Sequence, residues 1–381
     1  MEHKKNLLFI YYRLFKPGGV TKTLVNLMNE LVNDYNVTVL LLIKNENSYF
    51  ELDPRVKVLS IDTFNHPAFT KGCTFLNTKL GQKIPRRVSI KSYLYDYGSY
   101  STLKNWINKN HQQYDFIVTC LYKLSAYLSS NKQVQPKIVT WEKNSFEGIN
   151  KFWQSFPRKH YKNIKGVVTL NNQGEKYYSE FNNNVKKIYN ITGKPYEDNT
   201  IDFSTKSNQM TYVGRFSKEK NIDHIIDIFS KLKNKEDYIL NLIGDGELRN
   251  KLEEQIQSLN LQDRIILHGL LKPTAVNEIL KKSKFILLTS STEGLPNVLV
   301  EGMMAGNVIV SYNCKYGPDE IINENNGFLI PLYDKNTFVD KLQYLIDNPK
   351  ITNSLCISSY EEATKWKKEK IVKQWKDIFD N

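Results

Sequence analysis

Hydrophobic residues in this chain form short runs that alternate with longer segments of helical periodicity. The clearest case is the stretch 284–311. Its apolar run at 285–288 predicts a buried parallel strand, and a small polar loop follows it. The next residues predict a helix with Pro296 in its first turn and Gly306 just past its end. A second apolar run at 308–310 predicts another strand, so the stretch is a strand–helix–strand unit.

The first half of the chain shows the same alternation. Apolar residues spaced three and four apart predict a helix that begins at Thr21. Residues 171–181 predict a short helix, whereas residues 66–100 show neither pattern and are expected to be irregular. Short apolar runs predict five strands, at 7–10, 37–43, 115–119, 137–141 and 166–170.

The second half repeats this arrangement after the polar stretch 193–209, which is the best candidate for a linker. A helix is predicted at 222–232, and a last helix at 364–381 has one apolar face and one lysine-rich face. Further strands are predicted at 210–213, 240–243, 265–269 and 327–330. The pattern therefore predicts an α/β protein with two domains, each built on a parallel sheet.

The composition is that of a globular protein large enough for two domains. The chain has 381 residues, of which 40% are hydrophobic and 12% aromatic. No apolar run reaches the roughly 18 residues of a membrane-spanning helix, and the N-terminus leads into a strand without a signal-peptide cleavage site. The four cysteines lack metal-ligand spacing. We therefore expect a cytoplasmic protein with no bound metal.

The net charge of +13 is compatible with nucleic acid, an anionic membrane surface or a phosphorylated substrate. No nucleic-acid-binding motif is present, so no nucleic-acid partner is expected. The stretch 75–100 interleaves Lys and Arg with Leu, Ile and Tyr, and it has two interpretations. It is a solvated loop with snorkelling lysines, or a patch attracted to anionic lipid at about 1 kcal/mol per basic residue. The second interpretation would place the protein peripherally on the inner face of the cytoplasmic membrane.

Two carboxylates flank the predicted turn after the strand at 285–288. Glu293 lies in the loop and Glu301 lies in the helix, in an E-x7-E spacing. Glu301 falls among apolar neighbours, where a carboxylate is costly without a partner. The spacing alone is common and is also compatible with an exposed glutamate and a local cap. The full stretch EGLPNVLVEG between two apolar strands is far more specific, and it lies at the edge where open parallel sheets bind ligands.

Basic residues follow the predicted strand at 210–213. Arg215 and Lys220 lie five apart in a loop that leads into a helix. Both can converge on a diphosphate, Arg through its planar fork and Lys as a point charge, and Gly214 lets the loop turn tightly. A basic loop before an amphipathic helix would look the same, so this motif alone leaves the question open.

Two glycine-rich turns also follow predicted strands. Gly18 and Gly19 meet a helix N-terminus, where free N–H groups and the helix dipole favour an anion. A turn without a ligand explains an isolated Gly-Gly pair equally well. Gly244 and Gly246 form a Gly-Asp-Gly turn after the strand at 240–243.

Taken together, these motifs resemble the retaining glycosyltransferases of family 4. The resemblance covers most of the chain, is strongest from Val213 to Ile330, and in the first half is one of pattern more than of residues. The motifs that carry it are, in chain order, GRFSKEK at 214–220, GDGE at 244–247, HG at 268–269, EGLPNVLVEG at 293–302, and GPDEII at 317–322 with NG at 326–327.

The resemblance implies the GT-B fold, in which two Rossmann-like domains face each other across a cleft and a C-terminal helix returns to the first domain. The corresponding boundaries are 1–190 for an N-terminal acceptor-side domain, 191–360 for a C-terminal nucleotide-sugar-binding domain and 361–381 for the returning helix.

The resemblance also implies roles for single residues. Arg215, Lys220 and Glu293 are the predicted catalytic residues: the two cations would offset charge on the leaving phosphate, and Glu293 would lie near the donor sugar. Glu301 would accept hydrogen bonds from the ribose hydroxyls. The relatives bind the donor without a metal, and no cofactor is expected beyond the nucleotide-diphosphate sugar itself. The other predicted donor-binding residues are Gly18, Gly19, Gly214, Gly244, Gly246, His268, Gly294, Leu295 and Asn297.

The acceptor side departs from the family. Relatives often carry a histidine near the end of the strand at 137–141, and this chain has Lys143 there. We assign the acceptor side to Glu142, Lys143 and Asn144, because a lysine can hold a phosphate or sugar hydroxyls. In the other interpretation, Lys143 is a surface residue and Glu142 is a carboxylate at a helix start.

The predicted function is that of a retaining hexosyltransferase. It would move a hexose or N-acetylhexosamine from a nucleotide-diphosphate sugar, with a UDP-sugar favoured, to a glycan or lipid-diphosphate-linked acceptor in bacterial cell-surface polysaccharide synthesis. The main alternative is a non-catalytic GT-B subunit that binds the acceptor or stabilises a partner glycosyltransferase. A related nucleoside-diphosphate-sugar phosphorylase or synthase is a further alternative, and only net charge supports a nucleic-acid-binding protein.

Overall fold

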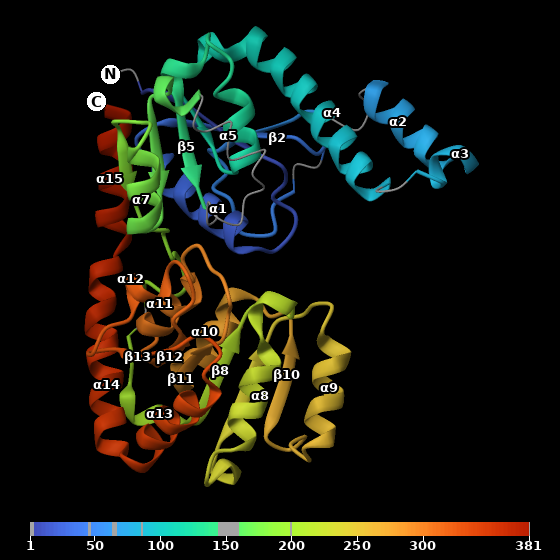
Figure 1. The fold of residues 1–381 in the computed structure, drawn as a ribbon. Helices are drawn as coiled ribbons and strands as arrows, with labels where there is room; N and C mark the ends of the chain where they lie inside the picture. The colour runs from blue at the N-terminus through green and yellow to red at the C-terminus, as the bar shows by residue number, and fades with distance from the viewer. Residues whose placement is uncertain are drawn as a thin grey trace. The chain divides into compact units, whose positions relative to one another are not determined.

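The computed structural model describes residues 4–44, 47–62, 67–84, 87–143, 160–198 and 200–380. The chain forms two compact units (Figure 1). The first comprises Met1–Thr169, Gln173–Ile188 and Trp375–Asn381, and the second comprises Leu170–Asn172 and Tyr189–Gln374. Each unit contains one parallel sheet, as the alternation of apolar runs and helical segments predicts.

The sheet of the first unit has seven strands in the order β3-β2-β1-β4-β5-β6-β7. All neighbouring strands pair in parallel. The sequence missed the two edge strands, β3 and β7, because their partly exposed residues form no continuous apolar run. The strand bounds are β1 Asn6–Tyr11, β2 Asn36–Leu41, β3 Lys57–Ser60, β4 Phe116–Thr119, β5 Ile138–Glu142, β6 Gly166–Thr169 and β7 Val185–Lys187.

Helices cover this sheet. In α1 the buried residues recur at helical spacing, which explains why the helix packs on the strands that it connects. A buried core cluster of this unit includes side chains from β1, β2, β4, α4 and α5. The α-helix bounds are α1 Gly19–Leu31, α2 Pro67–Asn77, α3 Lys79–Gln82, α4 Arg87–Asn110, α5 Tyr122–Leu128 and α7 Asn172–Ser179.

The expectation that residues 66–100 are irregular was wrong, because α2, α3 and most of α4 lie there. Gly72 and Gly81 are points of close contact in this region. A Cβ at Gly72 would overlap the Leu94 side chain on α4, and one at Gly81 would overlap the Phe75 carbonyl oxygen. Within the first unit, α2 and α3 project away from the sheet (Figure 1).

The sheet of the second unit has six parallel strands in the order β10-β9-β8-β11-β12-β13. The Asn-Gly pair at 326–327 leads into β13, which pairs in parallel with β12. The strand bounds are β8 Ser207–Val213, β9 Ile239–Ile243, β10 Ile265–Gly269, β11 Ser283–Leu288, β12 Val308–Tyr312 and β13 Gly327–Ile330.

The helices of the second unit connect its strands and follow the last of them. Two of them, α13 and α14, pack on each other and on β12 after the last strand. The bounds are α8 Ile222–Ser230, α9 Arg249–Ser258, α10 Pro273–Lys282, α11 Asn297–Met304, α12 Pro318–Ile321, α13 Lys335–Asp347 and α14 Pro349–Glu362.

The C-terminal helix α15, Lys368–Asp380, returns to the first unit, as predicted. Its Trp375 ring packs edge-on against Trp141 of β5, with centroids 4.9 Å apart. Lys376 pairs with Asp34 at 2.6 Å, and the Lys5 ammonium donates to the Phe379 carbonyl at 2.7 Å. These contacts explain why the last residues belong to the first unit although they end the chain.

Strand order in both sheets reverses at one point. In the first sheet β1 lies between β2 and β4, and in the second β8 lies between β9 and β11. Ligands of open α/β sheets bind outside the carboxyl ends of the strands at such a switch point. In the second sheet this is where the loops after β8 and β11 begin.

Candidate functional site

The loops after β8, β9 and β10 are joined by backbone hydrogen bonds. The Gly214 N–H donates to the Ile243 carbonyl at 3.0 Å, and the Gly244 N–H donates to the Gly269 carbonyl at 2.9 Å. The Phe216 N–H donates to the Asp245 carbonyl at 2.9 Å. Backbone hydrogen bonds therefore hold together the loops at the carboxyl edge of the second sheet.

Two of the predicted donor-binding glycines are required by this close approach. Gly244 has a φ of +142°, and a Cβ there would overlap the Gly214 carbonyl oxygen. A Cβ on Gly246 would overlap the backbone of Phe216. Glycine at these positions thus has a structural reason that stands beside the predicted role in binding.

The loop after β11 is held against the loop after β8. The Asn221 side chain donates to the Thr289 carbonyl at 2.9 Å, and Asn221 itself has a left-handed backbone with φ 45°. The Ser291 N–H donates to the Glu219 carbonyl at 2.8 Å. These bonds fix the two loops that carry the predicted catalytic residues.

The structure brings two of those residues into contact. The Lys220 ammonium lies 2.6 Å from Glu293 Oε1, and both side chains are mostly buried, with 21% and 13% of their surface exposed. Arg215 is exposed on the same loop as Lys220. The contact joins residues 73 positions apart, as expected if both serve one site.

Neighbouring groups respond to this cluster of charge. The Ser217 hydroxyl, which lies 2.6 Å from the Glu219 carboxylate, and the nearby cations Lys220 and Arg215 hold the pKa of Glu219 below its usual value. Burial, together with the carboxylates of Glu293 and Glu219, raises the pKa of Tyr212 well above its usual value. The Tyr212 hydroxyl therefore stays protonated and donates to the Arg215 carbonyl at 3.2 Å.

Glu301 is buried in α11, as its apolar neighbours predict, with 7% of its surface exposed. Its partner is the Tyr196 hydroxyl, and sequence reasoning missed this residue. Leu295 is buried at the start of the same segment, whereas Gly294 and Asn297 are partly exposed. Pro296 directly precedes the first helical residue of α11.

His268 is the second-last residue of β10, and its ring nitrogen Nε2 lies 2.8 Å from Asn241 Oδ1 on β9. Partial burial lowers the pKa of His268. The ring is therefore neutral near pH 7 and partnered within the sheet. This geometry suits a strand-end histidine whose backbone, more than its ring, is available to a ligand.

The remaining predicted residues lie in the first unit, which is described by itself. Gly18 is the residue before α1, Gly19 is its first residue, and the Lys22 N–H donates to the Gly18 carbonyl at 2.9 Å. Asn144 lies outside the described residues. The helix N-terminus that the Gly-Gly turn predicts is therefore present.

The alternative interpretation, with Lys143 as a surface residue and Glu142 as a carboxylate at a helix start, was wrong, because Glu142 is the last residue of strand β5. Both are buried, with 3% and 7% of their surface exposed. The Lys143 ammonium contacts the Thr23 hydroxyl on α1 and lies 3.2 Å from the centre of the Trp141 ring. Burial lowers the pKa of Lys143 to about 7.

Glu142 lies in a polar pocket of its own. Burial raises the pKa of Glu142 to about 7, although hydrogen bonds from Tyr161, Ser125 and Tyr178 partly oppose the shift. These three hydroxyls belong to the first unit, so the Glu142 carboxylate makes these hydrogen bonds within that unit. Of the two residues, Lys143 is the one that contacts α1, the helix that follows the Gly-Gly turn.

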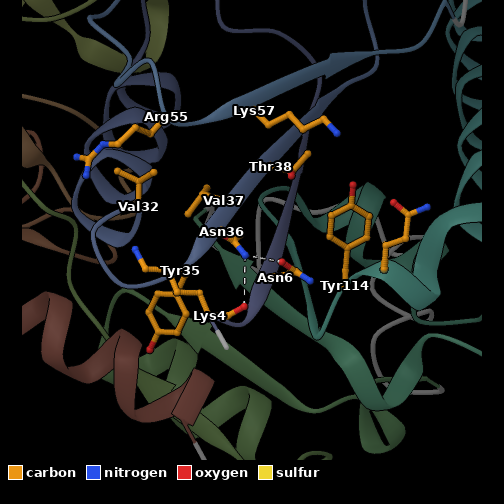
Figure 2. A pocket seen from close by; sticks show the side chains of 11 residues that line it. Lys4, Asn6, Val32, Tyr35, Asn36, Val37, Thr38, Arg55, Lys57 and Tyr114 are labelled. Carbon is orange, nitrogen blue, oxygen red and sulfur yellow. Dashed lines mark hydrogen bonds between the residues drawn. The ribbon is translucent and has the colours of Figure 1, made fainter. Parts of the chain in front are cut away.

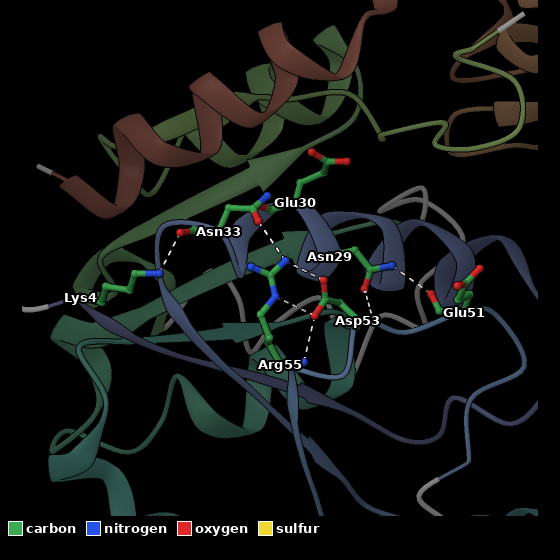
Figure 3. Close-up of polar contacts among 7 residues, drawn as sticks. All are labelled: Lys4, Asn29, Glu30, Asn33, Glu51, Asp53 and Arg55. Carbon is green, nitrogen blue, oxygen red and sulfur yellow. Dashed lines mark hydrogen bonds and ion pairs between the residues drawn. The ribbon is translucent and has the colours of Figure 1, made fainter.

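A pocket of about 480 Å³ opens at the opposite, amino-terminal edge of the first sheet (Figure 2). Several of its polar groups have hydrogen-bond partners within the first unit. Arg55 pairs with Asp53 at 2.7 Å and donates to Asn33, and Lys4 donates to the Asn33 carbonyl (Figure 3). The Asn36 amide donates to Asn6 Oδ1 at 2.9 Å. We assign no ligand to this pocket.

Within the described parts of the chain, no group of three or more His, Cys, Asp or Glu side chains is arranged to hold a metal ion. No helix in those parts is long and apolar enough to cross a membrane.

The model of the family Glycosyl transferases group 1 matches residues 194–366. The amylovoran biosynthesis glycosyltransferase AmsD of Erwinia amylovora is 27% identical over 282 residues, which cover 71% of this chain and 79% of that protein. A Campylobacter jejuni α-1,4-N-acetyl-D-galactosaminyltransferase, named for an undecaprenol-diphosphate-linked glycan, is 23% identical over 364 residues, with 94% of each chain covered.

Solved structures share the fold over the whole length. TarM of Staphylococcus aureus, solved with UDP, fondaparinux and α-GlcNAc-glycerol, has a TM-score of 0.74 at 15% identity, with 99% of this chain and 100% of that chain covered. HepE of Anabaena, solved with UDP-glucose, has a TM-score of 0.70 at 16% identity, with coverage of 98% and 99%. The chain has the GT-B fold, and its residues 194–366 match the family of the group 1 glycosyl transferases.

Proposed function

We propose that this glycosyltransferase moves a hexose or N-acetylhexosamine from a UDP-sugar to a glycan or lipid-diphosphate-linked acceptor in the synthesis of a bacterial surface polysaccharide. The observation that carries the proposal is the Lys220–Glu293 pair at the switch point of the second sheet, with Arg215 on the same loop. UDP or UDP-glucose occupies the TarM and HepE structures, and one of the similar proteins is an N-acetylgalactosaminyltransferase.

The cations would act on the leaving group. In the free protein the Lys220 charge is matched by Glu293 at 2.6 Å. A bound diphosphate would share that ammonium and would also be within the reach of the exposed Arg215. Charge on the phosphate grows as its bond to the sugar breaks, so the two cations bind the transition state more tightly than the ground state.

The reaction follows from these roles. An oxygen of the acceptor hydroxyl forms a bond to the anomeric carbon, and the bond between that carbon and the β-phosphate oxygen breaks. The proton of the hydroxyl passes to the phosphate oxygen that leaves on the same face, and UDP is released. Glu293 orients the donor sugar and stabilises positive charge on its ring. Configuration is retained without a separate nucleophile.

Glu301 would bind the nucleoside. A carboxylate can accept hydrogen bonds from several donors at once, and the Tyr196 hydroxyl is one donor to Glu301. The vicinal ribose hydroxyls are donors of the kind that a carboxylate accepts. The free energy of burying this carboxylate is then offset by hydrogen bonds on both sides.

The test is a panel of UDP-, GDP- and ADP-sugars, read by thermal shift and by slow donor hydrolysis. We expect stabilisation by the UDP-sugars, lost in Arg215→Ala and Glu301→Ala. Arg264→Ala and Glu278→Ala are controls of the same chemistry elsewhere in the second unit and should respond like the wild type. A protein that responds to no nucleotide would instead be the non-catalytic GT-B subunit.

We propose in addition that the helices α2 and α3 contact an anionic membrane surface. Phe75 and Leu80 leave 45% and 67% of their surface exposed, and the charged residues around them are all basic. Residues 63–95 contain six Lys or Arg and no Asp or Glu. An anionic membrane interface binds segments that combine exposed apolar side chains with Lys and Arg and that contain no Asp or Glu.

This second proposal is tested with vesicles. The protein should sediment with vesicles that contain phosphatidylglycerol and stay in solution with phosphatidylcholine alone. Leu80→Ser with Phe75→Ser should weaken binding, whereas Leu270→Ser, which removes an equally exposed leucine from the second unit, should not. Equal binding by the double variant and the wild type would contradict the proposal.

A further inference from the structure

Three side chains that lie outside the strands and helices of the second unit hold the stretch from Gly294 to Glu301. The Asn171 amide donates to the Gly294 carbonyl at 3.1 Å, and the Asn190 amide donates to Asn297 Oδ1 at 2.9 Å. The Tyr196 hydroxyl bonds to Glu301. These three partners come from Leu170–Asn172 and from the start of Tyr189–Gln374, the segments at which the chain passes between its two units.

The contacts follow the geometry of α11. Asn297 and Glu301 are four residues apart, so their side chains lie on the same face of the helix, one turn apart. Asn190 and Tyr196 approach that face, and both are buried, at 6% and 2% exposure. The face that carries the predicted nucleoside-binding residues is therefore held by two buried polar partners.

The Tyr196 hydroxyl can only be a donor in this arrangement. Burial, the charge of Glu301 and the hydrogen bond to it all raise the pKa of Tyr196, so the phenol keeps its proton. A hydrogen bond to an ionised acceptor is stronger than one between neutral groups. The hydrogen bond from Tyr196 thereby restricts the orientation of the Glu301 carboxylate.

We propose that Tyr196 is a positioning residue that aims the Glu301 carboxylate at the ribose hydroxyls of the nucleotide, and that Asn190 supports Asn297 on the same helix face in the same way. The inference rests on the proposed function, because it needs Glu301 to bind ribose. Sites of this kind lose affinity when the supporting residue is removed even though the contacting residue remains.

The experiment compares two ligands in two proteins. Dissociation constants for UDP and for 2′,3′-dideoxy-UDP are measured by calorimetry with the wild type and with Tyr196→Phe. Phe keeps the ring that fills the site and removes only the hydroxyl. We expect UDP affinity to fall roughly tenfold in the variant, the order of one hydrogen bond to a charged group, and the affinity for dideoxy-UDP to stay within about twofold.

The control is Tyr35→Phe, which removes a comparable bond, 2.7 Å to the Asp380 carboxylate, from the first unit. It should leave both affinities unchanged. A general loosening of the fold would lower the affinity for the two ligands alike. Equal losses of affinity in Tyr196→Phe would therefore overturn the positioning role and leave the proposed function standing.

A wild type that binds both ligands equally would overturn the contact between Glu301 and ribose. The positioning roles of Tyr196 and Asn190, which depend on that contact, would then be overturned as well. If Tyr196→Phe proves unstable, Asn190→Ser serves as the second variant. It should lower UDP affinity severalfold with an unchanged unfolding midpoint, and unchanged UDP affinity would contradict the proposal for Asn190.

Discussion

At the scale of single residues, the Lys220–Glu293 pair is the point where the proposed chemistry can be tested most directly. Lys220→Ala leaves the Glu293 carboxylate facing the diphosphate without its partner, 2.6 Å away in the wild type. We expect kcat/KM to fall by about 10²–10³, as for the loss of one strong transition-state donor. Glu293→Gln should lower turnover to a similar degree with the fold intact.

The comparison for this prediction is Lys281→Ala, which breaks an exposed pair with Glu278 at 3.0 Å. Exposed pairs contribute little, so this variant should match the wild type in both stability and turnover. Circular dichroism of all three variants checks the fold. Wild-type turnover in Lys220→Ala or Glu293→Gln would remove the basis of the catalytic assignment.

Buried charge at the end of β5 leads to a second prediction, about pH. Glu142 has a pKa raised to about 7, so its ionisation destabilises the folded state as the pH rises from about 4.5 to 7. Lys143 has a pKa lowered to about 7, so its protonation destabilises the folded state as the pH falls from about 10.5 to 7. Together the two groups produce a minimum of stability near neutral pH.

Unfolding midpoints in urea, measured from pH 5 to pH 9, check this prediction. Glu142→Gln should lack the decline between pH 5 and 7, and Lys143→Met should lack the rise above pH 7. The Asp115→Asn variant, which changes an exposed carboxylate in the same unit, should keep the wild-type curve. Parallel curves for all proteins would show that the two buried groups do not titrate as described.

Residues of the candidate site differ in how far the sequence could identify them. Arg215, Lys220, Glu293 and Glu301 were predicted because each belongs to a local motif of fixed spacing. Their roles stay predictions, although the structure brings Lys220 and Glu293 into contact. Tyr196 could not be predicted, because nothing in its own neighbourhood says that it meets a helix more than a hundred residues later.

At the scale of elements, apolar runs identified the central strands of both sheets because those strands are covered on both faces. Sequence analysis did not identify the edge strands β3 and β7, because they are short and partly exposed. Sequence analysis missed the helices between 67 and 100 for another reason, since that stretch shows no helical periodicity of apolar residues. Gly72 and Gly81 allow neighbouring helices to come close together there.

A third prediction concerns this helical pair. Gly72→Val should force α2 away from α4, because even a Cβ at that position would overlap Leu94. Overpacking of this kind costs about 1–3 kcal/mol, and here it should appear as faster proteolysis and faster amide exchange in α2. UDP affinity should not change, because the predicted donor residues of the second unit lie on other elements. Lys71→Ala, the neighbouring change without added volume, is the matched control.

At the scale of the whole molecule, the chain crosses between its units more than once, and the last crossing places α15 partly in each. The first unit therefore needs residues that are synthesised last. The sequence indicated a returning helix through its family resemblance, but the amphipathic pattern alone would fit any surface helix. The physical reason for the return is the burial of Trp375 and Phe379, both fully covered.

The fourth prediction uses one tryptophan from each unit. Trp375 packs on Trp141 in the first unit, and Trp366 packs on Tyr189 in the second, with centroids 4.2 Å apart. A buried Trp→Ala change costs about 3–5 kcal/mol, enough to separate the unfolding of one unit from that of the other. Because UDP should bind the second unit, it should raise only the transition of that unit.

In Trp375→Ala, calorimetry should therefore show an early transition that UDP does not move and a later one that UDP raises. In Trp366→Ala the early transition should be the one that responds to UDP. The two variants are controls for each other, since each removes one tryptophan from a buried pair of aromatic rings. A single transition raised by UDP in both variants would mean that the units unfold together, and the return of α15 would then couple the stability of the first unit to donor binding in the second.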